Sequence, residues 1–323
     1  MEYGVHLPLI DFSGKGFSLA ELRAYAKRAS ELGYTFLCAN DHLLFSRPWL
    51  DGPTALAAVL EASGSMTLAT TVSIPVVRGP MVTAKTLGAI DLLSGGRLVV
   101  GVGPGSSERD YKAAGVPFEE RWKRFNEIIE VLRTLWTPQS EGFQGSFYST
   151  DGFQLEPYPA QRPAPPIWVA SWGSKAGLRR VARHGDGWLA SGYNTTPEGF
   201  AESLAYLSQQ LSLVGKKSES FPNGIATLWM YVTEDRSKAE EVLSTVLGPT
   251  LNRPLEELRE RLPIGPPEEC AKKLTAYAAA GAQRVFLWPL DDELEQLDLF
   301  YERVIPLSMS SDRSRKGPIA ITT

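Results

Sequence analysis

The sequence predicts an α/β fold, a closed (β/α)₈ TIM barrel formed by one domain over residues 1–306. Short β-branched and apolar runs alternate with longer stretches of helical period, which is typical of repeated strand–helix units around a parallel sheet. Eight such runs are found, and eight strands close a barrel of this kind. The length of 323 residues permits a barrel as a single domain.

The predicted elements follow one another in strict alternation. The strands are expected at residues 3–7, 35–39, 66–74, 98–102, 167–170, 187–190, 225–232 and 284–288. The first helix is marked by the capping-box spacing of Ser18 and Glu21 and by Gly33 at its C-terminal end. Further helices are expected at residues 80–93, 121–136, 174–184, 197–213, 236–247, 267–280 and 294–304.

Three stretches depart from this alternation. Residues 138–166 are rich in Gly, Pro and aromatic residues and are too long for an ordinary connection, so we interpret them as a functional insertion between strands four and five. Its aromatic side chains are candidates for contacts with an apolar substrate. Residues 248–266 form a second irregular segment that could cover a site, and residues 307–323 are predicted to be a polar C-terminal tail.

Charge and cysteine content narrow the classes of partner. The formal net charge is −4 without long basic or acidic runs, so neither nucleic acid nor an anionic membrane is expected as a partner. We expect a small-molecule substrate. Two distant cysteines do not indicate a disulfide framework, and the N-terminus does not resemble a signal peptide, so we expect a cytoplasmic protein.

In barrel enzymes, catalytic residues lie on the loops that follow the strands. Asp41 and His42 follow the second predicted strand, where an imidazole can exchange protons near neutral pH and a carboxylate can orient it. The alternative is a capping Asp beside a structurally hydrogen-bonded His. His6 and His184 are expected to be structural, and no metal site is predicted from three scattered histidines and two distant cysteines.

The third and fourth strands end in small residues. Thr70, Thr71 and Ser73 could let a planar ring approach the barrel mouth, although Thr is also common in strands for its β-propensity alone. Gly103 and Gly105 belong to a glycine-rich turn that permits close backbone approach to a ligand. This turn is not the dinucleotide-binding fingerprint, because a proline interrupts it and the third glycine is absent.

The loop after the fifth strand is the candidate phosphate site. Ser171, Gly173 and Ser174 lead directly into a helix, whose first backbone N–H groups can bind an anion. Lys175 adds a positive charge. The alternative is that Ser174 serves only as the N-cap of this helix.

From about Gly4 to Pro306 the chain resembles the bacterial luciferase-like monooxygenase superfamily, including its deazaflavin-dependent oxidoreductases. Motifs in the same order carry the resemblance: Asn40-Asp41-His42-Leu43, Ser94-Gly95-Gly96-Arg97-Leu98 with Gly101-Val102-Gly103-Pro104-Gly105, Gly115-Val116-Pro117-Phe118 with Glu120-Arg121, and Gly185-Asp186-Gly187-Trp188. The resemblance implies a (β/α)₈ barrel with a flavin or deazaflavin ring across its mouth, and it implies homodimers.

The resemblance also assigns roles to residues. It implies a non-prolyl cis peptide at Thr71–Val72 that supports the ring, and a cofactor phosphate held by Gly173 and Ser174. Together with the mouth residues above, the implied cofactor contacts are Thr70, Thr71, Val72, Ser73, Gly103, Gly105, Ser171, Gly173 and Ser174. His42 would move the proton that accompanies hydride transfer to or from coenzyme F420, and Asp41 would orient the imidazole.

One departure limits the substrate assignment, and three hypotheses stay open. Sugar-phosphate dehydrogenases of this branch have a Glu just after the glycine-rich loop, where this chain has Ser106, so that activity is not carried over; Glu108 has no assigned role. The leading hypothesis is F420-dependent hydride transfer to or from a small organic substrate. The alternatives are an FMN-dependent monooxygenase and a non-redox, phosphate-binding isomerase or aldolase, with noncatalytic flavin binding a further possibility.

Overall fold

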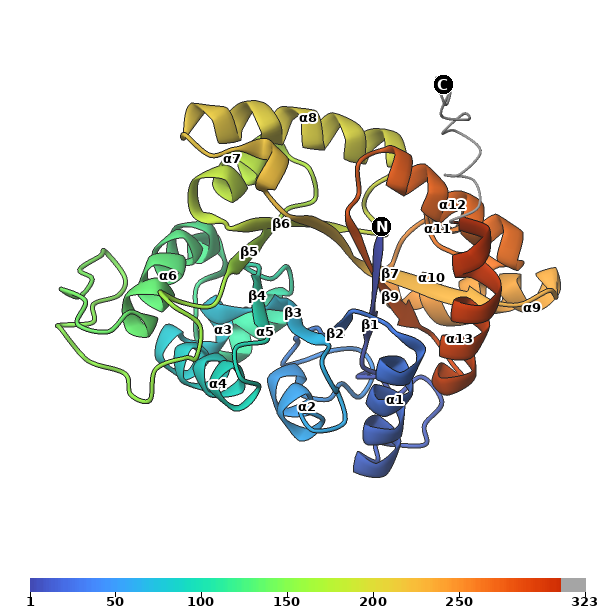
Figure 1. Cartoon of the computed structure of the whole chain (residues 1–323), viewed down its shortest axis with the longest axis horizontal. Coiled ribbons are helices and arrows are strands. Elements are labelled where there is room, and N and C mark those ends of the chain that lie inside the picture. The colour runs from blue at the N-terminus through green and yellow to red at the C-terminus, as the bar shows by residue number, and fades with distance from the viewer. Residues whose placement is uncertain (309–323) are drawn as a thin grey trace, which may run out of the picture.

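A computed structural model describes residues 1–308 and shows eight parallel strands closed into a barrel (Figure 1). Strand β1 pairs with β2 on one side and with β9 on the other, and β6 pairs with β7, which closes the ring. The predicted (β/α)₈ fold is therefore confirmed. The barrel strands are β1 (Glu2–His6), β2 (Phe36–Ala39), β3 (Thr67–Ser73), β4 (Leu98–Val102), β5 (Ile167–Ala170), β6 (Gly187–Ser191), β7 (Asn223–Val232) and β9 (Arg284–Pro289).

The lower part of the barrel interior is filled by side chains. Phe36, Trp168 and Phe286 pack there, together with smaller residues from four other strand positions. Gly4 leaves them room, because a β-carbon at this position would lie 2.6 Å from the β-carbon of Phe36. A ligand can therefore enter only at the C-terminal ends of the strands, which is where barrel enzymes place their sites.

The long helices predicted from the sequence surround the sheet (Figure 1). The side chain of Ser18 accepts a hydrogen bond from the Glu21 N–H, and Gly33 ends the first helix in the left-handed conformation, as the sequence predicted. The long helices are α1 (Leu19–Leu32), α4 (Pro80–Leu93), α6 (Arg121–Trp136), α7 (Lys175–His184), α8 (Pro197–Leu213) and α12 (Pro267–Ala279).

Short elements were missed by the sequence analysis. Segments of four to seven residues hold too few apolar positions to show a helical period, so α2 (Gly52–Ala58), α3 (Pro75–Arg78) and α5 (Glu108–Ala113) were not predicted. The expected irregular stretch 248–266 instead holds α10 (Gly248–Leu251), α11 (Leu255–Arg261) and β8 (Ile264–Gly265), which pairs with the end of β7. The helix expected at 236–247 is α9 (Arg236–Glu241) followed by π-helix η3 (Val242–Leu247), and that at 294–304 is α13 (Glu293–Leu299) followed by π-helix η4 (Phe300–Val304). Two 3₁₀ turns complete the chain, η1 (Phe118–Glu120) and η2 (Ser218–Ser220).

The inserted stretch 138–166 runs along the outside of the barrel beyond α6 (Figure 1). Glu127 on α6 accepts hydrogen bonds from the backbone N–H groups of Ser146 and Phe147, and Asp91 on α4 accepts from Gln161. These contacts place the insertion against outer helices. Of the predicted tail 307–323, only residues 307 and 308 are described, and the rest lies outside the described residues. Across residues 1–308, no helix combines the length and apolarity needed to cross a membrane.

Candidate active site at the C-terminal mouth of the barrel

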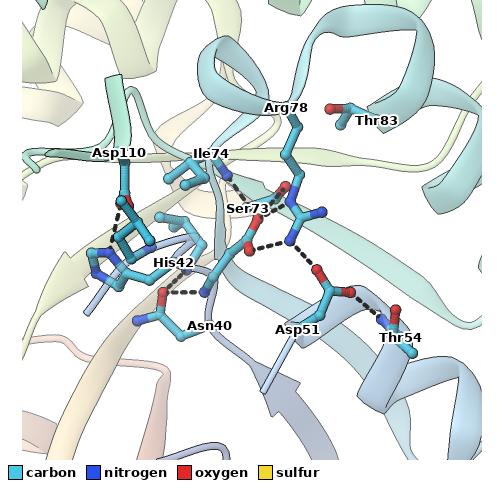
Figure 2. A network of polar contacts seen from close by, with 12 residues as sticks. Asn40, His42, Asp51, Thr54, Ser73, Ile74, Arg78, Thr83 and Asp110 are labelled. Carbon is cyan, nitrogen blue, oxygen red and sulfur yellow. Dashed lines mark hydrogen bonds and ion pairs between the residues drawn. The ribbon is translucent and has the colours of Figure 1, made fainter. Parts of the chain in front are cut away.

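His42 lies on the loop after β2 and is bound by a carboxylate from another element. Its Nδ1 lies 2.9 Å from Oδ2 of Asp110, which belongs to α5 after β4 (Figure 2). The other oxygen of Asp110 accepts the Leu44 N–H at 2.7 Å. Because Nδ1 faces the carboxylate, Nε2 is the imidazole atom left to exchange a proton with a ligand.

Asp110 is suited to hold this imidazole in place. Its side chain is 3% exposed, whereas that of His42 is 23% exposed. Burial alone would raise the pKa of Asp110, but the hydrogen bonds from His42 and from the Leu44 N–H outweigh it, so this pKa lies below its ordinary value. The carboxylate therefore stays charged near neutral pH and holds the imidazole by its Nδ1 atom.

The expectation that Asp41 orients the imidazole is wrong. Asp41 is 1% exposed and forms a two-pronged ion pair with Arg78 of α3, with both N–O distances at 2.6 Å. Arg78 also binds Asp51, the N-cap of α2, whose carboxylate accepts the Thr54 N–H (Figure 2). Strand β2 ends at Ala39, and in the loop that follows the Asp41 carboxylate is taken up by Arg78, so adjacency in sequence does not bring it to the ring of His42.

Asp41 therefore joins the loop after β2 to the segment after β3. Burial alone would lower the pKa of Arg78, but its bonds to Asp41 and Asp51 raise it above the ordinary value, so the guanidinium stays charged. Longer contacts to the Ser73 hydroxyl and the Ile74 N–H, both at 3.4 Å, add to the same anchor. The role of Asp41 in this structure is to position the loops that carry the site.

Two of the predicted β3 residues, Thr70 and Ser73, bond within the protein, whereas Thr71 and Val72 lie at a bulge of the strand. The Thr70 hydroxyl donates to the Gly101 carbonyl at 2.7 Å, and the Ser73 hydroxyl faces Asp41, so both are engaged within the protein. The register of β3 against β4 shifts between Thr70 and Ser73, and the Thr71–Val72 peptide there is cis, as the resemblance implied. The cis peptide and the half-buried side chain of Val72 thus lie at the bulge.

Contacts between neighbouring loops show that four predicted segments converge. The Val72 N–H lies 3.4 Å from the side-chain oxygen of Asn40, which precedes Asp41. A β-carbon at Gly103 would lie 3.0 Å from Val72 and 3.6 Å from Ala170, the residue before Ser171. The ends of β2, β3, β4 and β5 therefore lie side by side. Gly103 lies where the backbone that follows β4 contacts the bulge of β3.

The predicted phosphate loop begins α7. The Ser174 side chain accepts the Gly177 N–H at 3.1 Å, so this serine is the N-cap of α7. Gly173 has a φ of +96°, and a β-carbon there would lie 2.7 Å from the Ser203 hydroxyl. The Ser171 hydroxyl accepts the Gly173 N–H at 3.3 Å, which holds the turn. The first N–H groups of α7 are the groups that an anion could use.

An aromatic layer, missed as a site by the sequence analysis, crosses the top of the barrel interior. The ring of His6 stacks on Trp288 with centroids 4.3 Å apart, and Trp288 stacks on Trp229 at 4.2 Å. Trp49 meets Trp288 at 5.6 Å and His42 at 4.7 Å. The sequence places Trp229 and Trp288 in two predicted strands, but only the fold shows that their rings stack.

Three buried nitrogens of this layer have no hydrogen-bond partner among the described residues: His6 Nδ1, Trp49 Nε1 and Trp229 Nε1. Nε2 of His6 faces the Thr227 N–H and the Thr71 hydroxyl, both at 3.4 Å, so it is the accepting nitrogen. Burial lowers the pKa of His6 to about 3, so the ring is neutral and Nδ1 carries its proton. All three nitrogens are therefore N–H donors.

Comparison with known proteins identifies the family. The model of the family described as luciferase-like monooxygenase matches residues 5–256. The chain belongs to this family. The resemblance inferred from the motifs at residues 40–43 and 101–105 is thereby confirmed, and with it the expectation of a luciferase-like oxidoreductase.

Two curated relatives of this luciferase-like chain carry different cofactor names. F420-dependent hydroxymycolic acid dehydrogenase of Mycobacterium tuberculosis is 26% identical, with 91% of this chain and 86% of the relative covered. FMNH(2)-dependent dimethylsulfone monooxygenase of Pseudomonas putida is 24% identical, with coverage of 97% and 92%. Among solved structures, an F420-dependent secondary alcohol dehydrogenase superposes with a TM-score of 0.83 at 19% identity, covering 95% of this chain and 98% of the other, which supports the fold.

Proposed function

We propose that this luciferase-like oxidoreductase uses coenzyme F420 and catalyses hydride transfer to or from a small organic substrate. The observation that carries the proposal is the His42–Asp110 pair at 2.9 Å beside the bulge of β3. A buried carboxylate that stays charged keeps the imidazole in one orientation, with Nε2 left to exchange a proton with the substrate. Both cofactor classes named among the relatives, flavin and deazaflavin, suit the family.

The residues at the mouth fit a planar ring with a phosphate arm. Gly103 and Gly173 are positions where a side chain would occupy the space next to the bulge and the α7 loop. Thr71 and Val72 would support the ring, with Thr70, Ser73 and Gly105 shaping the strand ends beneath it. Ser171, Gly173 and Ser174 would hold the phosphate at the N-terminus of α7, where free N–H groups favour an anion.

The chain's own residues supply the proton and the orientation. When bound, the deazaflavin supplies or accepts a hydride at a ring carbon. His42 Nε2 gives a proton to the substrate oxygen when a carbonyl is reduced, and it takes this proton when an alcohol is oxidised. Asp110 holds Nδ1 throughout, and Asp41 with Arg78 fixes the loop from which His42 projects.

The aromatic layer indicates which substrates fit beside the ring. It offers N–H donors at His6, Trp49 and Trp229 among stacked apolar faces. A buried donor without a partner is costly, and a substrate oxygen would remove that cost. The substrates expected are therefore carbonyl compounds or alcohols with an apolar body.

The test of this proposal is His42→Ala with a panel of alcohols and carbonyl compounds and oxidised or reduced F420. Turnover should fall by about 10²–10⁴-fold while cofactor affinity changes little, since the side chain moves a proton and does not hold the cofactor. Turnover at the wild-type rate would remove His42 from the reaction.

The second candidate is an FMN-dependent monooxygenase, favoured by the relative of that class that covers 97% of this chain. The same barrel mouth and phosphate loop would serve it. Consumption of oxygen coupled to reduced FMN, with no F420 turnover, would select this function over the first. The family match leaves the non-redox isomerase or aldolase without support.

We further propose a homodimer in the cytoplasm. The dimer rests on the likeness to the luciferase-like family, and light scattering of the purified chain tests it. The compartment rests on Cys38 and Cys270, which are both buried as free thiols. Secretion of the native protein into an oxidising compartment would contradict it.

A further inference from the structure

A cavity of about 370 Å³ lies beside the barrel, between the loop that leads from β1 into α1 and the loop that leads from β9 into α13. These two helices are neighbours in the ring around the sheet (Figure 1). Apolar side chains form part of the wall, among them Ile10, Leu22 and Leu290. The site residues His42 and Thr71 do not line it.

The remaining wall is strongly acidic. Six carboxylates and one cation, Lys15, face this cavity, and no ion pair within residues 1–308 involves any of the seven. One helical turn beyond the cavity a carboxylate is again paired with a cation, because Asp298 lies 2.7 Å from Arg28. The unpaired carboxylates are Asp11, Glu21, Asp291, Asp292, Glu293 and Glu295.

Tyr25 supplies a second, independent observation. It lines the cavity from α1, is 1% exposed, and its hydroxyl has no hydrogen-bond partner among the described residues. Burial, followed by the charges of Asp291 and Asp292, raises the pKa of the half-buried Glu293. Asp11 accepts the Gly14 and Gly16 N–H groups and Asp291 accepts the Asp292 N–H, but no cation within residues 1–308 pairs with any of the six carboxylates. A donor-rich cation could therefore pair with these carboxylates and also donate to the Tyr25 hydroxyl.

The form of the cavity distinguishes between kinds of cation. No group of three or more His, Cys, Asp or Glu side chains among the described residues is arranged to hold a metal ion. The carboxylates are therefore spread along the wall and do not converge on one point. An elongated molecule with an apolar chain and several charged ends fits such a wall.

We propose that this cavity binds an aliphatic polyamine, whose ammonium groups contact Asp292 and Glu293 and whose chain lies against the apolar wall. One ammonium group donates to the Tyr25 hydroxyl. The site is separate from the proposed cofactor site, but it shares one wall with the barrel mouth: Phe12 lines the cavity and meets Trp229 with ring centroids 6.0 Å apart. The proposal does not depend on the proposed function.

The experiment is calorimetric titration of the full chain, without added cofactor, using spermidine as the probe. Saturable binding at one site is expected, weakening as ionic strength rises, because partly exposed charges are screened by salt. Asp292→Asn and Glu293→Gln should each weaken binding about tenfold, the value of one charge-assisted hydrogen bond. Asparagine suits the left-handed backbone of residue 292, whose φ is +46°.

Two further variants separate this site from general attraction between opposite charges. Glu119→Gln removes one exposed negative charge from η1, outside the cavity, and should leave the affinity unchanged. Tyr25→Phe should weaken binding without lowering the melting temperature of the free protein, because the hydroxyl it removes has no partner.

Absence of saturable binding would overturn the proposal, as would equal weakening by Glu119→Gln. Binding of Mg²⁺ that displaces spermidine at comparable concentration would also overturn it, since a metal ion would then be the ligand. His42→Ala should bind spermidine as the wild type does, so that loss of the proposed redox function and loss of this site can be told apart.

Discussion

Replacing Asp110 by Asn tests the pairing on which the proposed proton transfer depends. The substitution keeps the shape of the side chain and an oxygen that can accept the Leu44 N–H, but it removes the negative charge 2.9 Å from His42 Nδ1. Asp41→Asn is the matched control, because it also removes one negative charge, here from the residue that precedes His42 in the sequence. That carboxylate binds Arg78 and not the imidazole.

The size of the effect follows from the burial of the pair. A hydrogen bond to a charged group contributes about 1.5–3 kcal/mol, against about 0.5–1.5 kcal/mol for a neutral one. Asp110 is 3% exposed and His42 is 23% exposed, so solvent screens the pair only in part. A loss of about 1.4 kcal/mol corresponds to a tenfold fall in kcat/KM.

The assay is a double-mutant cycle on kcat/KM with F420 at saturation. Asp110→Asn should lower kcat/KM about tenfold in the wild type and less than about twofold in His42→Ala, because the two residues act as one unit. Asp41→Asn should mainly lower the free energy of unfolding.

Two results would contradict a functional pairing of Asp110 with His42. Equal falls in the wild-type and His42→Ala backgrounds would show that Asp110 acts independently of the imidazole. A kcat/KM for Asp41→Asn that matches that of Asp110→Asn, at unchanged stability, would show that the observed pairing is not the functional one.

Other predictions concern the phosphate loop, the anchor and the aromatic layer. Gly173→Val should weaken cofactor binding by at least about tenfold in fluorescence titrations, whereas Gly215→Val, also at positive φ but in open space, should not; equal affinities would place the phosphate elsewhere. Arg78→Met leaves the buried Asp41 carboxylate unpaired and should lower the free energy of unfolding by about 3 kcal/mol in urea titrations; an unchanged midpoint would contradict the anchor. His6 stays neutral in the fold to about pH 3, so its contribution is present above pH ~6.5 and is lost as pH falls toward 3. Unfolding free energy should drop by about 2 kcal/mol between pH 8 and 5, and His6→Asn should remove that part of the dependence; an unaltered slope would contradict it.

The barrel could be predicted because its signals are local. Strands β4 and β5 are short, nearly continuous apolar runs, β4 followed by Gly103 and β5 preceded by Pro166, and their bounds match those predicted. The first helix carries its own start and stop signals in Ser18 and Gly33. The cis Thr71–Val72 peptide came from family resemblance alone, since no local propensity predicts it.

The site was only partly predictable because its key contacts join distant elements. His42 could be selected by its place after a strand, but its partner Asp110 lies 68 residues away on a helix too short to show a period. Asp41 was paired with His42 through adjacency, whereas Arg78, 37 residues on, competes for it with two charged hydrogen bonds. His6 was assigned a structural role because its neighbours on β7 and β9 appear only when the barrel closes.

In the proposed function, the ends of β2, β3, β4 and β5 form one receptor for a deazaflavin and its phosphate. Equilibrium titration of the purified chain with F420 and with FMN, followed by the fluorescence of the mouth tryptophans, tests it most directly. Saturable quenching by F420 is expected at concentrations at least about tenfold below those needed for FMN. Tight FMN binding with negligible response to F420 would contradict the choice of cofactor, and no response to either would contradict the receptor itself.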